Sequence, residues 1–222
     1  MLKGSIEVAM QGKPFNERDL ELLSGRTIGH YQDRAEDFWQ GTRDHDVSQN
    51  IETLLQYLPV PAPAKILDLG CGPGRDLITF RDRGHVAIGL DGSKAFCEMA
   101  RRVSGQEVLC QDFIALNLEA NGFDGIFANA TLFHIPMCEI ERVLGELFMA
   151  LKPGGVLFSS NPRGPNIEEI NGERYGAYYD LENWRLLLKT AGFAELTHYY
   201  RPPGVPRDQQ PWLASAWRKP KS

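Results

Sequence analysis

The chain has 222 residues, with a hydrophobic content of 42% and a charged content of 24%, values ordinary for a globular domain with a full core. Its formal net charge of −5 argues against nucleic acid as a partner, because phosphate binding requires a basic face. No apolar run reaches the roughly 18 residues that a membrane span needs, and the N-terminus lacks the pattern of a signal peptide. Four cysteines without a CxxC pair indicate free thiols, so we expect a cytoplasmic protein.

The N-terminal part, residues 1–58, is predicted to be a helical cover over the rest of the chain. Apolar positions at helical spacing predict three helices in it, over residues 15–23, 29–40 and 51–58. The first helix is expected to stop at Ser24 and Gly25. The third follows a dense polar cluster and is expected to have Asp46 or Ser48 as its N-cap.

The remainder, residues 59–222, alternates short apolar runs with amphipathic segments. This pattern predicts a parallel sheet with helices between its strands. The five runs cover residues 64–69, 86–90, 107–110, 123–128 and 156–160. Two further runs, 193–200 and 212–217, fit an antiparallel hairpin at the edge of the sheet. Residues 161–179 are predicted to be a long functional loop, and Asp180 is expected to cap the helix that follows it.

A glycine-dense turn follows the first of these strands, in the stretch ILDLGCGPGRD at residues 66–76. Gly70, Gly72 and Gly74 allow the backbone to approach a ligand closely and to adopt positive φ. A dinucleotide fingerprint needs its third glycine one position later, where this chain has Arg75. No lysine follows the glycines, so a triphosphate cradle is not expected either.

Acidic residues end the next two strands. Asp91 ends the second strand, where its carboxylate can accept from both hydroxyls of a ribose. Asp112 follows the third strand, where it can accept from an adenine amine, with Phe113 alongside. The glycine turn and these acids together predict a site for an adenosine group whose binding does not depend on phosphate groups.

Residues 64–200 resemble the class I S-adenosylmethionine-dependent methyltransferases, in particular the small single-domain type that acts on small molecules. Five stretches carry the resemblance, in the family's order and spacing: ILDLGCGPGRD, VAIGLDGS, LCQDF, FDGIFANATLFHI and ALKPGGVLFSSNP. The implied fold is α/β, a doubly wound Rossmann-like sheet of seven mostly parallel strands with the last strand inserted antiparallel. The implied cofactor is S-adenosyl-L-methionine, with S-adenosyl-L-homocysteine as product and no metal.

The same resemblance assigns roles to single residues. The three glycines of the turn would pass under the methionine part, and Asp68 would help to order the loop and the cofactor amine. Asn129, after the fourth strand, would face the methionine end and the methyl group. The full set of expected cofactor-binding residues is Asp68, Gly70, Gly72, Gly74, Asp91, Gly92, Asp112, Phe113 and Asn129.

Methyl transfer from a sulfonium is a direct displacement, so the protein mainly aligns the reactants and excludes water. A general base is needed only if the nucleophile arrives protonated. His134 is the candidate base because it follows the fourth strand, although a packing role fits it equally well. Tyr31 is the second catalytic candidate, as a residue of the cover that closes over the cofactor, with core packing as its alternative.

The acceptor is expected to bind to the segments outside the shared motifs. Candidate substrate-binding residues are Arg43, His45, Asn50, Arg163, Arg174, Tyr175 and Tyr179. Arginines and tyrosines suit a carboxylate-bearing or aromatic small molecule, and Arg201, Arg207 and Trp212 near the final hairpin add to the set. The sequence leaves open whether the acceptor atom is nitrogen, oxygen or sulfur, and whether the protein is a monomer or a homodimer.

Three other classes of function compete with this interpretation. Arg75 and the Asp112 motif count against an NAD-dependent dehydrogenase. A relative that binds the cofactor without catalysis would keep the same glycines and acids. A methyltransferase that acts on a protein or an RNA is the remaining alternative. For base amino groups the loop at residues 129–132, Asn-Ala-Thr-Leu, differs from the Asn/Asp-Pro-Pro-aromatic loop of such enzymes.

Overall fold

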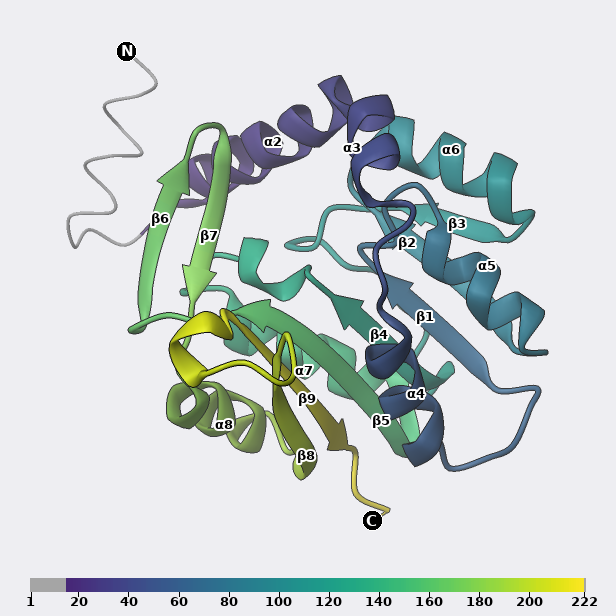
Figure 1. The fold of residues 1–222 in the computed structure, drawn as a ribbon. Coiled ribbons are helices and arrows are strands. Elements are labelled where there is room, and N and C mark those ends of the chain that lie inside the picture. Colours follow the sequence, from purple (N-terminus) through teal and green to yellow (C-terminus); the bar gives the residue numbers. More distant parts are fainter. Residues whose placement is uncertain (1–14, 222) are drawn as a thin grey trace.

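A seven-stranded sheet, in the order β3-β2-β1-β4-β5-β9-β8, runs through the computed structural model, which describes residues 15–221 (Figure 1). The strands are β1 (Lys65–Leu69), β2 (Val86–Asp91), β3 (Glu107–Cys110), β4 (Phe123–Asn129), β5 (Leu151–Pro162), β8 (Ala194–Arg201) and β9 (Trp212–Arg218). Strands β1 to β5 are parallel, and β9 pairs antiparallel with both β5 and β8. The predicted doubly wound fold with an antiparallel last strand is confirmed; the expectations for residues 1–14 lie outside the described residues.

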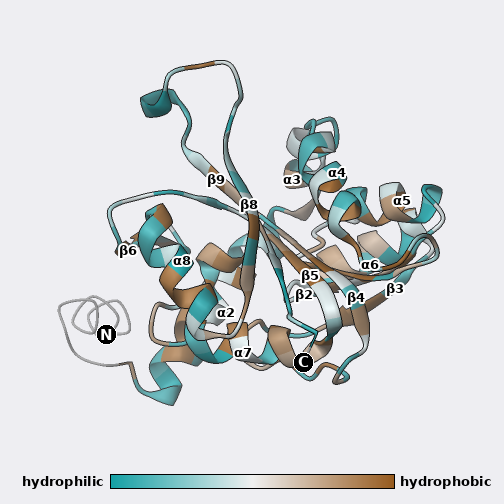
Figure 2. Ribbon diagram, turned by 90° about the horizontal axis from the view of Figure 1, so that it is seen from below, coloured by the Kyte–Doolittle hydropathy of each residue, from teal (hydrophilic) through white to brown (hydrophobic). Residues whose placement is uncertain are grey.

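Both faces of the sheet are buried, because successive side chains of each central strand point to opposite sides. In β4, Ile126 packs into one apolar cluster and Phe127 into the other, and Leu157 and Phe158 of β5 repeat the alternation. Three helices, α4 (Ser48–Tyr57), α5 (Arg75–Asp82) and α6 (Lys94–Ser104), contribute to the cluster of Phe127. Two others, α7 (Ile140–Ala150) and α8 (Leu181–Thr190), contribute to the cluster of Ile126. Figure 2 shows the apolar strands between these two helical layers.

The helices α2 (Glu17–Asp33) and α3 (Ala35–Thr42) lie across the carboxyl ends of the parallel strands (Figure 1). The predicted stop at Ser24 and Gly25 is wrong, because α2 continues to Asp33 and has Arg34 as its C-cap. Asn16 and Asp19 start this helix with a reciprocal capping box. Ser24 lies within this helix, and its hydroxyl makes a tertiary contact described below. Within residues 15–221, no helix has the length and apolar character that crossing a membrane demands.

The third predicted helix, α4, begins at Ser48, which is its first residue rather than its cap. The N-cap position is Val47, whose side chain makes no capping bond. Asp46 lies just outside the helix and accepts a hydrogen bond from the backbone N–H of Ser48 at 2.9 Å. The polar residues before the helix therefore order the turn that leads into it without capping it in the usual way.

The predicted loop at residues 161–179 is a hairpin instead. Its strands, β6 (Ile167–Asn171) and β7 (Arg174–Tyr178), form a separate antiparallel two-stranded sheet. A two-residue turn joins them, and Gly172 in that turn has φ 65°. The Asn-Gly dipeptide at residues 171–172 is the sequence signal for this hairpin. The hairpin packs against α2 and places β7 beside the cover.

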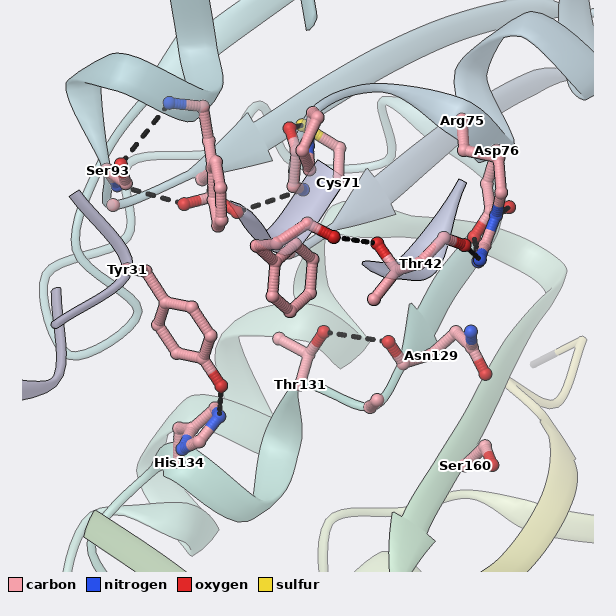
Figure 3. A pocket seen from close by; sticks show the side chains of 18 of the residues that line it. Tyr31, Thr42, Cys71, Arg75, Asp76, Ser93, Asn129, Thr131, His134 and Ser160 are labelled. Atoms are coloured by element: carbon pink, nitrogen blue, oxygen red, sulfur yellow. Dashed lines mark hydrogen bonds and ion pairs between the residues drawn. The ribbon is translucent and has the colours of Figure 1, made fainter. Parts of the chain in front are cut away.

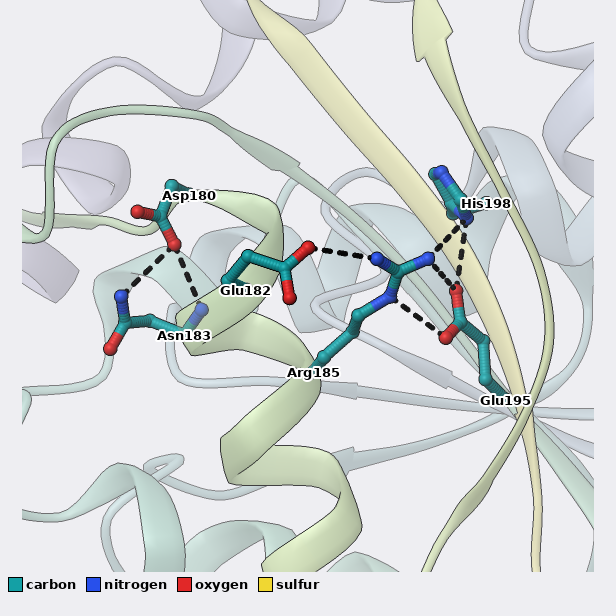
Figure 4. Close-up of polar contacts among 6 residues, drawn as sticks. All are labelled: Asp180, Glu182, Asn183, Arg185, Glu195 and His198. Atoms are coloured by element: carbon teal, nitrogen blue, oxygen red, sulfur yellow. Dashed lines mark hydrogen bonds and ion pairs between the residues drawn. The ribbon is translucent and has the colours of Figure 1, made fainter.

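Asp180 caps α8 as predicted, since its carboxylate accepts from the backbone N–H of Asn183 at 2.8 Å (Figure 4). The same view shows Arg185 of α8 bonded to Glu195 on β8 through two N–H groups, at 2.9 and 3.0 Å. His198 accompanies this pair at 2.9 Å from the Glu195 carboxylate. The network attaches α8 to the outermost strand of the sheet.

Phe127 provides a test of the two-faced core. Its ring is fully buried, 5.3 Å from the ring of Phe80 on α5 and 5.1 Å from the ring of Phe158. Phe127→Ala is expected to lower the free energy of unfolding by about 3–5 kcal/mol, because a cavity remains between the sheet and α5. Met149→Ala, at a site that is 57% exposed, is the control and should change it by less than about 0.5 kcal/mol. Equal effects in urea denaturation would contradict this packing.

Candidate functional site

A cavity of about 520 Å³ lies at the carboxyl ends of β1, β2 and β4, under the cover formed by α2 and α3. This volume is within the roughly 300–1,000 Å³ that small-molecule sites occupy. The predicted site residues that line it are Tyr31, His45, Asn50, Gly70, Gly72, Asp91, Gly92, Asp112, Phe113, Asn129 and His134. Residues from the cover and from the ends of separate strands thus meet around one space.

The glycine turn forms the floor of the cavity where β1 ends. A Cβ atom at Gly70, which has φ 75°, would lie 2.2 Å from the hydroxyl oxygen of Thr131, so only glycine fits there. The Thr131 hydroxyl is held in place by donating to the carbonyl of Leu69 at 2.8 Å. At Gly72 a Cβ would instead point at the ring of Phe38, 3.7 Å away, which brings the cover directly above the turn. Gly74 does not line the cavity and packs against Ala100 of α6.

Asp91 ties the glycine turn to the end of β2. Its carboxylate accepts from the backbone N–H of Gly72 at 3.0 Å and from that of Ser93 at 2.9 Å. Burial raises the pKa of Asp91 to about 6, although these backbone hydrogen bonds favour the ionised form. The carboxylate keeps free lone pairs on the cavity side of the turn, where donors from a ligand can reach it.

Asp112 and Phe113 lie where the chain leaves β3. The carboxylate of Asp112 accepts from the hydroxyl of Ser24 at 2.7 Å and from the backbone N–H of Ile114 at 3.1 Å. Ser24 comes from α2, so this contact joins the cover to the adenine side that the sequence predicts. Gly92 lies between the two acids, and a Cβ there would lie 2.8 Å from the side chain of Ile28 on the same helix.

Asp68 lies in β1 beneath the turn and does not line the cavity itself. Its Oδ2 atom is buried and has no hydrogen-bond partner among the described residues. Burial and the negative charge of Asp76 raise the pKa of Asp68 well above its usual range. Asp76 is itself paired with Arg75 at 2.7 Å, and Arg75 also donates to the carbonyl of Thr42 in the cover (Figure 3).

Helix α4, which follows the cover, reaches the end of β4 through an amide side chain. The Asn50 side chain donates to the Asn129 side-chain oxygen at 2.8 Å, and Asn50 is in turn the acceptor for the Tyr199 hydroxyl. The backbone N–H of Ala130 donates to the carbonyl of Ser160 at the end of β5. Asn129 is therefore fixed between α4 and the sheet, and Ser160 joins it on the cavity wall (Figure 3).

Tyr31 and His134 meet on the opposite wall (Figure 3). The Tyr31 hydroxyl lies 2.8 Å from Nε2 of His134, and Nδ1 of His134 lies 2.7 Å from the carbonyl oxygen of Tyr175. Burial lowers the pKa of His134 to about 4. The ring of Tyr31 packs edge-on against that of Phe38 at 5.6 Å, and Phe96 completes an apolar wall.

The remaining predicted substrate residues do not line the cavity. Arg43 is exposed and pairs with its neighbour Asp44, while Arg163 donates to backbone carbonyls of the loop between β8 and β9. Tyr179 is buried against Trp184. Tyr175 is buried too, and its hydroxyl donates to Glu168. Arg174 is half-buried behind the cavity wall, beside Tyr31.

Several cavity residues carry no clear signal in the sequence. Ser24, Thr42 and Thr131 are single hydroxyl residues within helices or turns, and only the tertiary fold brings them to the site. Arg201 and Trp212, predicted as additions near the final hairpin, do line the cavity. Arg201 donates to the backbone carbonyl of Asp46, which links the end of β8 to the turn before α4. Within residues 15–221, no group of three or more His, Cys, Asp or Glu side chains is arranged to hold a metal ion.

The central part of the chain is similar to known methyltransferases. Residues 66–155 match the family model described as a methyltransferase domain. A trans-aconitate 2-methyltransferase from Variovorax paradoxus is 35% identical over 114 residues, which are 50% of this chain and 43% of that protein. A malonyl-[acyl-carrier protein] O-methyltransferase from Enterobacter lignolyticus is 28% identical over 159 residues, 71% of this chain and 59% of that protein. The chain thus spans about half the length of these curated relatives.

Among solved structures, the fold is similar to that of 1,6-didemethyltoxoflavin-N1-methyltransferase from Burkholderia thailandensis, crystallised with bound 1,6-didemethyltoxoflavin and S-adenosylhomocysteine. The TM-score is 0.75, and the match covers 93% of this chain and 92% of that one at 21% identity. At this identity the likeness establishes the shared fold.

Gly70→Ala tests the close approach in the turn. The added methyl group must displace the Thr131 side chain and the backbone is held at positive φ, so the free energy of unfolding should fall by about 2–5 kcal/mol. Gly25→Ala is the matched control, because Gly25 is an exposed helical glycine with nothing within 4 Å of the added atom. That variant should gain about 0.5–1 kcal/mol from reduced backbone entropy. Two equally stable variants would refute this account of the turn.

Proposed function

Because this chain carries the class I S-adenosylmethionine-dependent methyltransferase domain, we propose that it transfers a methyl group from S-adenosylmethionine to a small-molecule acceptor. The main supporting observation is that the glycine turn, Asp91 and Asp112 lie around one cavity of small-molecule size. The named activities of the relatives, on trans-aconitate and on malonyl groups, support an acceptor of this kind.

The donor groups around the cavity fit the chemistry of this cofactor. Asp91 has lone pairs left for ribose hydroxyls, and Asp112 has them left for an adenine amine beside Phe113. The unpartnered Oδ2 of Asp68 lies beneath the turn, outside the cavity wall, and would reach the amino group of the methionine part through a water. Asn129 lines the cavity, and we propose that this part of the wall faces the methionine end of the cofactor.

When bound, S-adenosylmethionine supplies a methyl group that its sulfonium has already activated. This chain's residues then orient the acceptor and keep water away. Tyr31, Phe38 and Phe96 provide an apolar wall above the glycine turn. The remaining space is lined by His45, Asn50, Arg201 and Trp212, and it suits a carboxylate-bearing or aromatic acceptor.

We further propose that the protein acts in the cytoplasm, without a nucleic-acid partner or a metal, as a monomer or homodimer.

Cofactor binding is the direct test of this function. S-adenosylmethionine should bind with heat detectable by isothermal titration calorimetry, and Asp91→Ala should weaken binding by about 1.5–3 kcal/mol, the value of hydrogen bonds to a charged group. Met149→Ala, far from the cavity, serves as the control and should bind like the unchanged protein. The absence of any binding would overturn the proposal, whereas binding without transfer to any acceptor would favour the non-catalytic alternative.

The dependence of binding on pH follows from the raised pKa of Asp91. The carboxylate is protonated as the pH falls through about 6, and it then accepts hydrogen bonds less well, so cofactor affinity should fall between pH 7 and pH 5. Folding has the opposite sign, because a carboxyl group whose pKa is raised by folding contributes less to stability once it ionises above pH 6. Asp91→Asn should remove the pH dependence of binding, which calorimetry at a series of pH values will measure. A wild-type affinity that stays constant from pH 7 to pH 5 would be the contrary result.

A further inference from the structure

Three distant segments of the chain converge on the phenol of Tyr31. Tyr31 belongs to α2, His134 to the 3₁₀ turn Leu132–His134 that follows β4, and Arg174 to β7. The backbone N–H of Tyr175 donates to the hydroxyl of Thr27 at 3.0 Å, which joins β7 to α2 one helical turn before Tyr31. The Tyr31 and His134 side chains both line the cavity, so the group that they form faces the acceptor.

The geometry fixes the direction of the hydrogen bonds. The carbonyl oxygen of Tyr175 only accepts, so Nδ1 of His134 carries the proton of the neutral ring. Nε2 is therefore an acceptor, and the Tyr31 hydroxyl donates to it. Burial, with help from the positive charge of Arg174, keeps the pKa of His134 near 4, so the ring is neutral at physiological pH. One lone pair of the Tyr31 oxygen faces Arg174, and the other is left to receive a donor.

Arg174 lies beside this pair, and its guanidinium faces the Tyr31 hydroxyl as a hydrogen-bond donor. Its Nε atom is buried without a hydrogen bond, and within residues 15–221 the side chain forms no ion pair. Burial raises the pKa of the Tyr31 phenol, while the Arg174 guanidinium lowers it and so favours negative charge on the phenol oxygen. The ionisable groups around Tyr31 and His134 are His30 of α2, Asp91 of β2, and Arg174 and Tyr178 of β7.

We propose that Tyr31 and His134 form a proton relay and that the acceptor is a neutral hydroxyl group, an inference that rests on the proposed methyl transfer. The acceptor oxygen bonds to the methyl carbon as the carbon–sulfur bond breaks, and the electron pair of that bond stays on sulfur. The acceptor proton passes to the Tyr31 oxygen while the Tyr31 proton passes to Nε2 of His134. The product is a methyl ether, and the imidazolium later returns its proton to solvent.

The relay selects among acceptor chemistries. A carboxylate is already ionised at neutral pH and has no proton for the relay to take. An alkylammonium holds its proton too tightly for a base as weak as His134. A hydroxyl oxygen becomes strongly acidic as its bond to carbon forms, so a weak base that is always unprotonated suffices. Arg174 acts through Tyr31 and is a positioning residue.

A purely structural role for the same contacts makes different predictions. If the Tyr31–His134 bond only latched α2 over the cavity, its loss would weaken cofactor binding and leave the turnover number unchanged. A relay requires the reverse, a fall in kcat with little change in cofactor Kd. Tyr178→Phe is the matched control, since Tyr178 is a half-buried tyrosine on β7 next to the group and outside the relay.

The first experiment needs no acceptor. Nitrogen-15 NMR of the protein saturated with S-adenosylmethionine reports the protonation of the His134 ring between pH 6 and pH 8. A neutral ring with its proton on Nδ1 is the expected result. An imidazolium, or a neutral ring with its proton on Nε2, would overturn the relay, because Nε2 would then have no lone pair to accept the Tyr31 proton.

The second experiment offers hydroxybenzoates, aliphatic hydroxy acids and the corresponding amino acids with labelled S-adenosylmethionine, and identifies the products as ethers, esters or amines. Ethers are expected. Tyr31→Phe should lower kcat by about 100-fold or more, and Arg174→Lys should retain more activity than Arg174→Gln. Esters or amines alone, bound cofactor without any product, or an unchanged kcat in Tyr31→Phe would each overturn the relay. If the wild-type protein does not bind S-adenosylmethionine at all, the proposed function itself is overturned.

Discussion

The carboxylate of Asp91 holds the site together, because it accepts backbone N–H groups from two separate elements. One is Gly72 in the turn after β1, and the other is Ser93 at the start of α6. The turn can therefore not move away from β2 without breaking a hydrogen bond to a buried carboxylate, which is costly. The same contacts leave part of the carboxylate facing the cavity. Burial of this carboxylate beside the ligand cavity raises its pKa.

The cover is attached to the rest of the molecule by polar contacts at the strand ends and by an apolar cluster with α6. Ser24 of α2 bonds to Asp112 after β3, Tyr31 of α2 bonds to His134 after β4, and Asn50 of α4 bonds to Asn129 at the end of β4. Apolar packing of Leu23 and Phe96 supports these contacts. A ligand that enters the cavity meets the groups that close it, so binding and closure are coupled through the same side chains.

The sequence allowed the central sheet to be predicted, and with it the convergence of several strand-end residues on one cavity, because the order of the strands is set by the parallel topology. Gly70, Asp91 and Asn129 each stand at a strand end, and parallel strands bring such ends to one edge. The hairpin over residues 167–178 was missed because only its turn, and not its strands, carries a strong local signal. Arg163 and Tyr179 were assigned to the acceptor by residue type, but tertiary packing directs both away from the cavity.

The division of charge across the cavity bears on catalysis. The carboxylates, Asp91 and Asp112, lie on the side predicted for the ribose and adenine, whereas the opposite wall has the neutral pair Tyr31 and His134. A carboxylate base beside the methyl group would attract the sulfonium charge before the reaction and stabilise the bound reactants. A neutral pair, backed by the positive Arg174, offers no such attraction and acts only as the proton leaves the acceptor. Interactions made only in the transition state raise kcat, so a neutral relay is better placed than a carboxylate to accelerate this step.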